Sequence, residues 1–313
     1  MGRMEERLYG TIKEYLDSID WSYEEDKAGL MMAYPITLKE HDIACVSYIM
    51  EETQTYGIYS TFEYNLDPSK RDEICWLVNE YNTALTTGRY FYDEQNNIIC
   101  CTIESAYDES LISKSAVADM LAFLVSNAEA IEKSIVGFTT GELTKEQALD
   151  VYLEEDVSYS SENFVDNTEK VYNTICDALD SIDYVYEREP DHLSVAFSVT
   201  GDDERVGYSI RASREYKTIK LTSYLCDVQS GTEDKMLYAI NYANNNITMG
   251  SLYISDGSIF YFSNLLFAES LISKESILDL FRCSFDICDG LNDKLIELGE
   301  GLISIDDFKQ IFN

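Results

Sequence analysis

Apolar side chains recur at helical spacing near the start of the chain, and the same spacing returns in its second half. The first stripe consists of Leu8, Ile12, Tyr15, Leu16 and Ile19, and the second of Val171, Ile175, Ala178, Leu179 and Ile182. Residues at this spacing share one face of a helix. Both segments are therefore predicted to be amphipathic helices that bury one face.

Three segments in which polar and apolar residues alternate follow each of these helices. Tyr56, Ile58, Ser60, Phe62 and Tyr64 are an example of the pattern. Such alternation is typical of antiparallel strands with one buried face. The sequence thus predicts a three-stranded meander in each half, over residues 29–35, 42–51 and 55–64 and over residues 192–200, 205–212 and 218–226.

A second helix, a hairpin and a third helix are predicted to complete each half. Asp67 before Pro68 predicts the start of the second helix, because aspartate is a good N-cap and proline fits the first helical position. Asp256-Gly257 predicts a two-residue hairpin turn, because glycine tolerates the positive φ that this turn requires. Ser113 and Ser273 are the predicted N-caps of the third helices.

Two short motifs indicate that the halves are copies of each other. Leu16-Asp17-Ser18-Ile19-Asp20 returns at residues 179–183, and Glu109-Ser110-Leu111-Ile112-Ser113-Lys114 returns at residues 269–274. The repeat predicts two homologous α+β domains of order α-β-β-β-α-β-β-α, each a mainly antiparallel sheet with helices packed on it. The expected parts are a first domain (1–134), an acidic linker with a short helix (135–163), a second domain (164–299) and a C-terminal helical arm (300–313). A plain linker and a frayed terminus are the alternative for the two smaller parts.

One polar pattern recurs in the predicted second helix of both halves. It consists of two asparagines three residues apart and a glycine six residues further on: Asn79, Asn82 and Gly88, and Asn241, Asn244 and Gly250. Residues at this spacing flank one face of a helix. We expect a structural role, in which the amides bind backbone groups where the helix meets the next strand. Contact with a ligand is the alternative.

The chain carries a strong negative charge, with 58 acidic and 23 basic residues and a formal net charge of -35. This charge repels phosphate backbones and anionic membrane surfaces, so neither nucleic acid nor membrane is expected as a partner. The acidity either keeps the surface solvated or steers basic partners toward it. A cytoplasmic location is expected, because the N-terminus lacks the apolar core of a signal peptide and no apolar run approaches the roughly 20 residues that cross a bilayer.

Cysteines and histidines form no catalytic pattern in the sequence. The eight cysteines include no Cys-x-x-Cys pair and do not recur at matching positions, so buried, reduced thiols are expected. His41 and His192 fall at different points of the two meanders. Motifs for phosphate loops, dinucleotide binding, zinc proteases and nucleophile elbows are absent from the sequence. We therefore expect no catalytic residue, no cofactor and no metal.

The asparagine pattern and the strand after it resemble the YbjN domain. The resemblance rests on Val78-Asn79-Glu80-Tyr81-Asn82 with Gly88-Arg89-Tyr90-Phe91-Tyr92-Asp93, and on Ile240-Asn241-Tyr242-Ala243-Asn244 with Gly250-Ser251-Leu252-Tyr253-Ile254. It covers most of both halves, but not the linker or the C-terminal arm. The family is labelled as bacterial sensory transduction regulators, and its fold resembles class I type III secretion chaperones. The resemblance implies a non-enzymatic binding module whose single-domain relatives work as dimers.

The main hypothesis from the sequence is a chaperone-like or regulatory protein-binding module. The two copies would pair like an intramolecular homodimer, which makes the chain a monomer with pseudo-two-fold pairing or a dimer. Apolar and tyrosine-rich surfaces would hold a protein or peptide segment, for example as an added strand, and acidic rims would favour a basic or amphipathic partner. Two alternatives stay open: a small-molecule sensor with a closed apolar cavity, and an enzyme with an interdomain site that uses His41 or His192.

Overall fold

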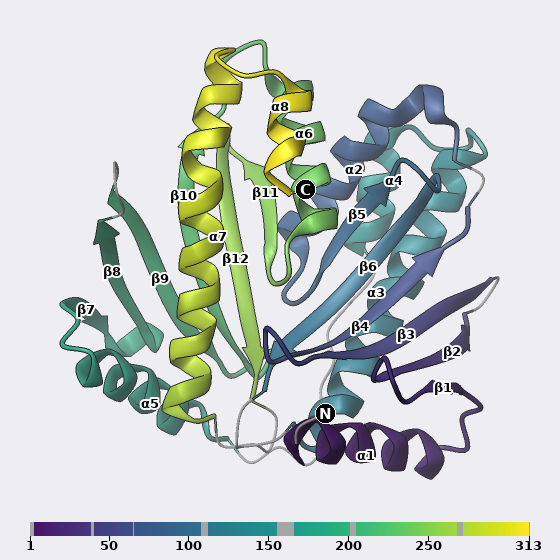
Figure 1. Cartoon of the computed structure of the whole chain (residues 1–313). Coiled ribbons are helices and arrows are strands. Elements are labelled where there is room, and N and C mark those ends of the chain that lie inside the picture. The colour runs from purple at the N-terminus through teal and green to yellow at the C-terminus, as the bar shows by residue number, and fades with distance from the viewer. Residues whose placement is uncertain are drawn as a thin grey trace.

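The computed structural model describes residues 3–38, 41–64, 66–107, 112–154, 166–200, 205–267 and 272–312 (Figure 1). Each half contains one six-stranded antiparallel sheet with helices packed on it. The predicted α+β class is therefore confirmed. Part of the repeated motif, at residues 109–111 and 269–271, and residues 155–163 of the expected acidic linker lie outside the described residues.

The elements of the first half form a sheet of strand order β1-β2-β3-β4-β6-β5. In chain order they are α1 (Arg3–Ser18), β1 (Glu24–Asp26), β2 (Met31–Thr37), β3 (Asp42–Met50), β4 (Thr55–Phe62), a 3₁₀ turn (Pro68–Lys70), α2 (Arg71–Ala84), β5 (Arg89–Asp93), β6 (Ile98–Ala106), α3 (Lys114–Thr139) and α4 (Lys145–Glu154). Helix α3 thus continues past the expected domain end at residue 134. The expected domain boundaries stay predictions.

The second half repeats this order in a sheet β11-β12-β10-β9-β8-β7. Its elements are α5 (Thr168–Ser181), β7 (Tyr186–Glu189), a 3₁₀ turn (Pro190–His192), β8 (Ser194–Thr200), β9 (Arg205–Ser213), β10 (Thr218–Asp227), α6 (Glu233–Asn246), β11 (Ser251–Ser255), β12 (Ser258–Leu266), α7 (Lys274–Glu300), α8 (Ile305–Lys309) and a final 3₁₀ turn (Gln310–Phe312).

The predicted element order needs one correction, because each sheet has an additional short edge strand. Strands β1 and β7 have no buried side chain, so they lack the alternation that marked the other strands. Strand β1 pairs with β2 only as far as Ala33. The next β2 residue facing that edge is Pro35, which has no N–H to donate, so the ladder ends there.

Most predicted starts and turns of the elements are confirmed. The Ser113 and Ser273 side chains each accept a hydrogen bond from a backbone N–H in the first turn of their helix. Asp256 and Gly257 both have positive φ and join β11 to β12 in two residues. Asp67 caps a 3₁₀ turn, and the α-helix begins only at Arg71.

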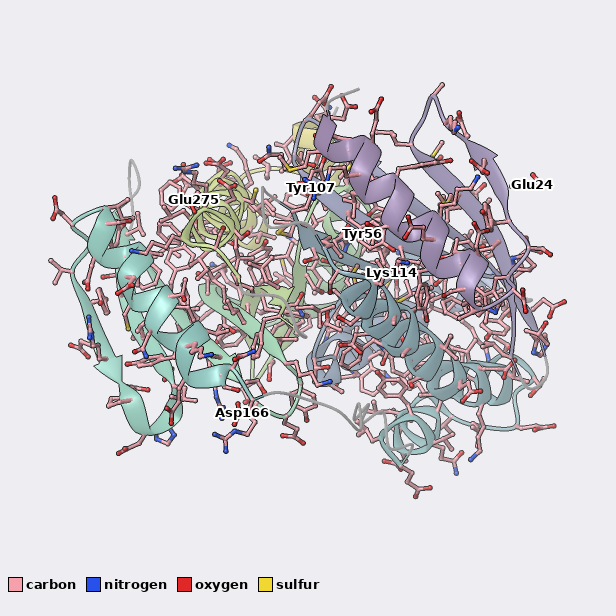
Figure 2. The ribbon with its side chains drawn as sticks, turned by 90° about the horizontal axis from the view of Figure 1, so that it is seen from below. Glu24, Tyr56, Tyr107, Lys114, Asp166 and Glu275 are labelled. Atoms are coloured by element: carbon pink, nitrogen blue, oxygen red, sulfur yellow. The ribbon has the colours of Figure 1, made fainter. Side chains whose placement is uncertain are left out.

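Helices cover one face of each sheet and bury the alternating apolar side chains there. Helices α1 and α3 lie side by side on the first sheet (Figure 2), and α5 and α7 pack together on the second. Tyr56 and Tyr107, both buried, lie in the interior between α1, α3 and the first sheet. A fully buried large apolar side chain stabilises the fold by about 1.5–3 kcal/mol. These two helix-covered faces are therefore the main source of stability.

Helices α2 and α6 lie between the two sheets. They pack on each other, and each also contacts both β5 and β11, the edge strands that lie next to these helices (Figure 1). The two sheets contact each other through β6 and β12. The short trailing helices support α2 and α6 from outside, α4 against α2 and α3, and α8 against α6 and α7. The halves thus meet mainly through equivalent elements, and the contacts of α2 with β11 and of α6 with β5 mirror each other.

All eight cysteines are free thiols, and all but Cys283 are buried. Burial raises the pKa of Cys45, Cys75, Cys100 and Cys288 to about 12. Thiol reagents attack the thiolate, so both burial and the raised pKa protect these side chains.

We expect Ellman's reagent at pH 8 to modify about one thiol before the others in the native protein, because Cys283 is the one cysteine that is not fully buried. In guanidinium chloride the unfolded protein should react at all eight cysteines. The absorbance of the thiolate that the reagent releases measures the reaction of the native and of the unfolded protein. Cys283→Ser should remove the fast phase, whereas several thiols reacting at one rate would contradict this burial pattern.

Candidate functional site

The second asparagine of each pair ties its helix to the following strand of its own half. The Asn82 amide donates to the carbonyl of Tyr90 at 2.9 Å and accepts from its N–H at 2.7 Å. Asn244 makes the same two bonds to Leu252, at 2.8 and 2.7 Å. In both halves the amide thus binds both backbone groups of one strand residue.

The first asparagine of each pair reaches into the other half. The Asn79 amide donates to the carbonyl of Ile254 in β11 at 3.0 Å and accepts from its N–H at 2.7 Å. Asn241 binds Tyr92 in β5 in the same way, at 2.9 and 2.8 Å. In each edge strand, the backbone of two residues is therefore bound by asparagine amides. Tyr90 and Leu252 are bound from their own half, and Tyr92 and Ile254 from the other half.

Gly88 and Gly250 place these edge strands against their neighbours. Both have a φ of +79°, and a Cβ at either position would lie 2.5 Å from a backbone carbonyl oxygen, that of Thr102 or Phe262. A side chain is excluded both by this contact and by the left-handed backbone. The glycine thus positions the strand that the asparagines bind.

A buried ion pair of the first half reaches across to the second half through its arginine. The Arg89 guanidinium pairs with the Glu104 carboxylate through two of its groups, Nη1 and Nη2. Its other N–H groups donate to the carbonyls of Asn244, Ile247 and Gly250, just at and beyond the end of α6. All five donors are therefore used, and the positive charge faces the negative end of that helix.

The matching positions of the second half hold uncharged residues. Ser251 replaces Arg89, and Asn264 replaces Glu104 and donates to the carbonyl of Thr86 at 2.8 Å. Arg89 and Glu104 were missed as site residues from the sequence. The only signal was a lone arginine directly after the glycine of the motif.

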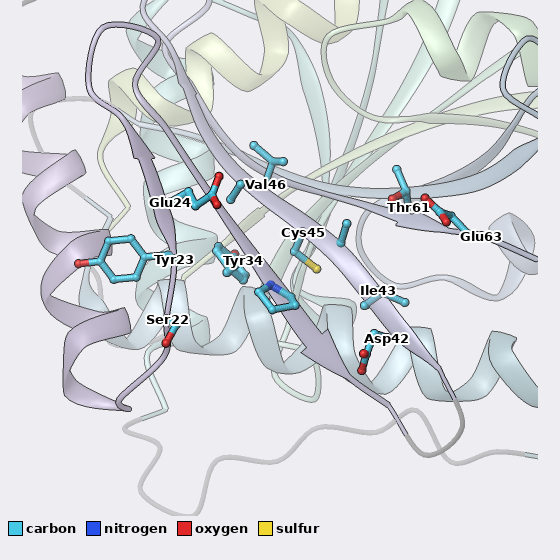
Figure 3. Close-up of a pocket in the computed structure, with 13 residues that line it drawn as sticks. Ser22, Tyr23, Glu24, Tyr34, Asp42, Ile43, Cys45, Val46, Thr61 and Glu63 are labelled. Atoms are coloured by element: carbon cyan, nitrogen blue, oxygen red, sulfur yellow. The ribbon is translucent and has the colours of Figure 1, made fainter.

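The outer face of the first sheet contains, at β2 and β3, a hollow of about 600 Å³ (Figure 3). Its floor is apolar and solvent-exposed, formed by the cross-strand pairs Ala33–Val46 and Pro35–Ala44. Its rim is acidic and includes Glu24, Asp42 and Glu63. We call this feature the outer-face hollow.

In the second sheet, serine stands at the positions that match Pro35 and Val46, and glycine at the one that matches Ala44. The cross-strand pairs there are Ala196–Ser209 and Ser198–Gly207. The apolar floor is therefore a property of the first copy and not a requirement of the scaffold. The sequence contained a signal for it, since small apolar residues stand where the alternation of β2 and β3 calls for polar ones.

The same family model matches this chain twice, over residues 9–135 and residues 172–297. Its description is "Putative bacterial sensory transduction regulator". The chain belongs to the YbjN family. Both YbjN regions contain the Asn-x-x-Asn pair and its glycine, so the bridging described above connects two domains of one family.

Among solved structures, the crystal structure of the ExsC–ExsE complex is similar to part of this tandem YbjN chain. The match has 13% sequence identity and a TM-score of 0.33, and it covers 42% of this chain and 97% of the other. No curated protein matches the chain.

The two histidines of the tandem YbjN protein lie apart. His41 Nδ1 is 2.9 Å from Glu132 Oε1, whereas His192 ends the 3₁₀ turn of the other half. Neither lines the outer-face hollow or the pocket between the halves at Trp76. Among the described residues, no group of three or more His, Cys, Asp or Glu side chains could hold a metal ion. No helix in the described ranges is long and apolar enough to cross a membrane.

Removing one bridging amide should loosen the opposite half. Asn79→Ala deletes both hydrogen bonds to Ile254, and we expect it to destabilise the protein by about 2 kcal/mol. Hydrogen exchange by NMR should show a faster Ile254 amide and an unchanged Tyr90 amide. The matched variant Asn82→Ala should do the reverse, and changes confined to the mutated half in both variants would contradict the bridging role.

Removing Arg89 alone should destabilise the protein more than removing the charges of both Arg89 and Glu104. Arg89→Met leaves Glu104 buried without its partner, so we expect a loss of about 3–5 kcal/mol in the free energy of unfolding. The double variant Arg89→Met/Glu104→Gln should recover a large part of this loss, because no buried charge remains. Urea unfolding measures both, and equal losses would show that the charge itself is unimportant.

Proposed function

We propose that this tandem YbjN protein is a non-enzymatic regulator that binds a basic, amphipathic segment of a partner protein. The outer-face hollow carries the proposal, because it combines an exposed apolar floor with an acidic rim. An apolar floor favours burial of apolar side chains, and the rim carboxylates favour lysine and arginine beside them. The net charge of -35 attracts such a segment from a distance.

The geometry of the sheet edges favours binding on the face rather than strand addition. The β5 and β11 edges are already bound by asparagine amides from both halves. The opposite edges are β1 and β7, which are three and four residues long and rich in charged side chains. Short charged edges resist pairing with another strand. The exposed outer face of β2 and β3 is therefore the better surface for a partner.

The two YbjN copies have different parts in this proposal. Each copy covers the edge of the other, which makes the pair an intramolecular counterpart of a homodimer working as a monomer. Only the first copy carries the apolar floor, so a single partner segment is held per chain. The description of the family as a regulator supports a binding role.

A phage-displayed library of random 12-residue peptides provides the test. Selection on the full chain should enrich sequences that mix lysine or arginine with apolar residues, and higher salt should weaken their binding. Pro35→Ser/Val46→Ser, which introduces the second copy's residues, should weaken a selected peptide about tenfold, because apolar contact area is lost. Fluorescence anisotropy measures the affinity.

Ser209→Val in the second sheet is the matched control and should leave the affinity unchanged. Circular dichroism should confirm that all variants are folded. No enrichment, or equal affinity for the wild type and the Pro35→Ser/Val46→Ser variant, would refute binding at the outer-face hollow.

A further inference from the structure

Two equivalent sites, one beside the β5–β6 hairpin and one beside the β11–β12 hairpin, differ in charge. At the first site, Arg71 at the start of α2 lies over the ring of Tyr238 in α6, with its guanidinium carbon 4.6 Å from the ring centre. Its Nη1 lies 3.7 Å from the carboxylate of Glu94, the residue after β5. The Tyr238 hydroxyl donates to the same carboxylate at 2.5 Å. The site thus holds a guanidinium between an aromatic ring and a carboxylate.

The pseudo-symmetric place has the same aromatic and acidic parts but no arginine. Trp76 of α2 stands at the position of Tyr238, and Asp256, the residue after β11, stands at that of Glu94. Glu233, at the start of α6, replaces Arg71. A pocket of about 400 Å³ lies there, lined by these three residues together with Glu80, Asn79 and Ile254.

The aromatic rings of both places also meet a lysine from the trailing helix of their own half. Lys309 Nζ lies 4.7 Å from the centre of the Tyr238 ring, and Lys145 Nζ lies 4.6 Å from that of Trp76. The two places therefore agree in their aromatic residue, their lysine and the carboxylate after the strand. They differ beside the aromatic ring. The Arg71 side chain fills this space at Tyr238, whereas the space at Trp76 is an open pocket with the Glu233 carboxylate at its edge.

We propose that the pocket at Trp76 binds a guanidinium group from outside the chain, at the place where its counterpart holds Arg71. The ring face attracts a planar cation, and the Glu80, Glu233 and Asp256 carboxylates supply opposite charge. Backbone N–H groups lower the pKa of Glu233, so this carboxyl stays ionised at neutral pH. The group arrives on an arginine side chain of a partner or on a free guanidino compound.

The guanidinium pocket is separate from the outer-face hollow, and the two share no lining residue. The proposal therefore stands apart from the proposed function. Asn79 contributes to the pocket and also binds Ile254 across the halves. An occupant of the pocket consequently touches both YbjN domains at once.

Trp76 fluorescence tests the proposal in a Trp21→Phe variant, because the chain has only two tryptophans. N-acetylarginine amide should change the emission in a saturable way, and N-acetyllysine amide should bind at least fivefold more weakly. N-acetylcitrulline amide has nearly the same shape without the charge and should not bind. A response to citrulline equal to that to arginine, or no saturable response to arginine, would overturn the proposal. Tighter binding of N-acetylarginine amide than of agmatine would indicate that the ligand is an arginine side chain of a partner. Tighter binding of agmatine would indicate a free guanidino compound.

Variants in the same background locate the site. Glu233→Arg places a guanidinium where Arg71 stands in the other copy, so it should abolish binding of N-acetylarginine amide. Asp256→Asn should leave the fold intact, because asparagine also accepts the left-handed backbone of the turn, and it should weaken binding of N-acetylarginine amide at least threefold. Glu63→Gln, at the outer-face hollow, should leave the affinity for N-acetylarginine amide unchanged. Unchanged binding in both pocket variants, with folding checked by circular dichroism, would place the ligand elsewhere.

Discussion

The edge of a β-sheet presents N–H and C=O groups that must find partners, and this requirement organises the whole molecule. Strands β5 and β11 end the two sheets at the point where the halves meet. Two asparagine amides cover each of these edges, and one of the two always comes from the other half. A primary amide has one donor and one acceptor side, so it replaces one residue of a neighbouring strand. The position of α2 and α6 between the sheets follows from this contact.

The two copies share the residues that cover the edge strands and differ both in their mutual contact and on their outer surfaces. The asparagines and glycines are the same in both halves, because each half needs them to cover an edge. Arg89, Arg71 and the apolar floor occur in the first copy only. Ser251, Glu233 and a face with two serines occupy the matching places of the second. Features that both copies share therefore build the scaffold, whereas features that only one copy has are candidates for recognition.

Elements with a strong local pattern could be predicted from the sequence. The helical stripes, the meander, the serine caps and the Asp256-Gly257 turn each depend on residues close together in the chain. Strands β1 and β7 could not, because their short exposed segments have no buried face to create a pattern. The asparagine pair was noticed as a recurring pattern, but spacing within a helix does not reveal that Asn79 reaches Ile254, 175 residues away. Likewise, only the fold brings Trp76 and Asp256 to one pocket.

The reciprocal asparagine contacts have a consequence for assembly. Asn79 and Ile254 would form the same hydrogen bonds if they belonged to two different molecules, and so would Asn241 and Tyr92. Exchange of halves between two chains would therefore preserve every bond across the interface, as in domain swapping. Covalent linkage favours pairing within one chain because it gives the second half a high local concentration near the first. Gene duplication has thus replaced an encounter that depends on protein concentration with one that does not.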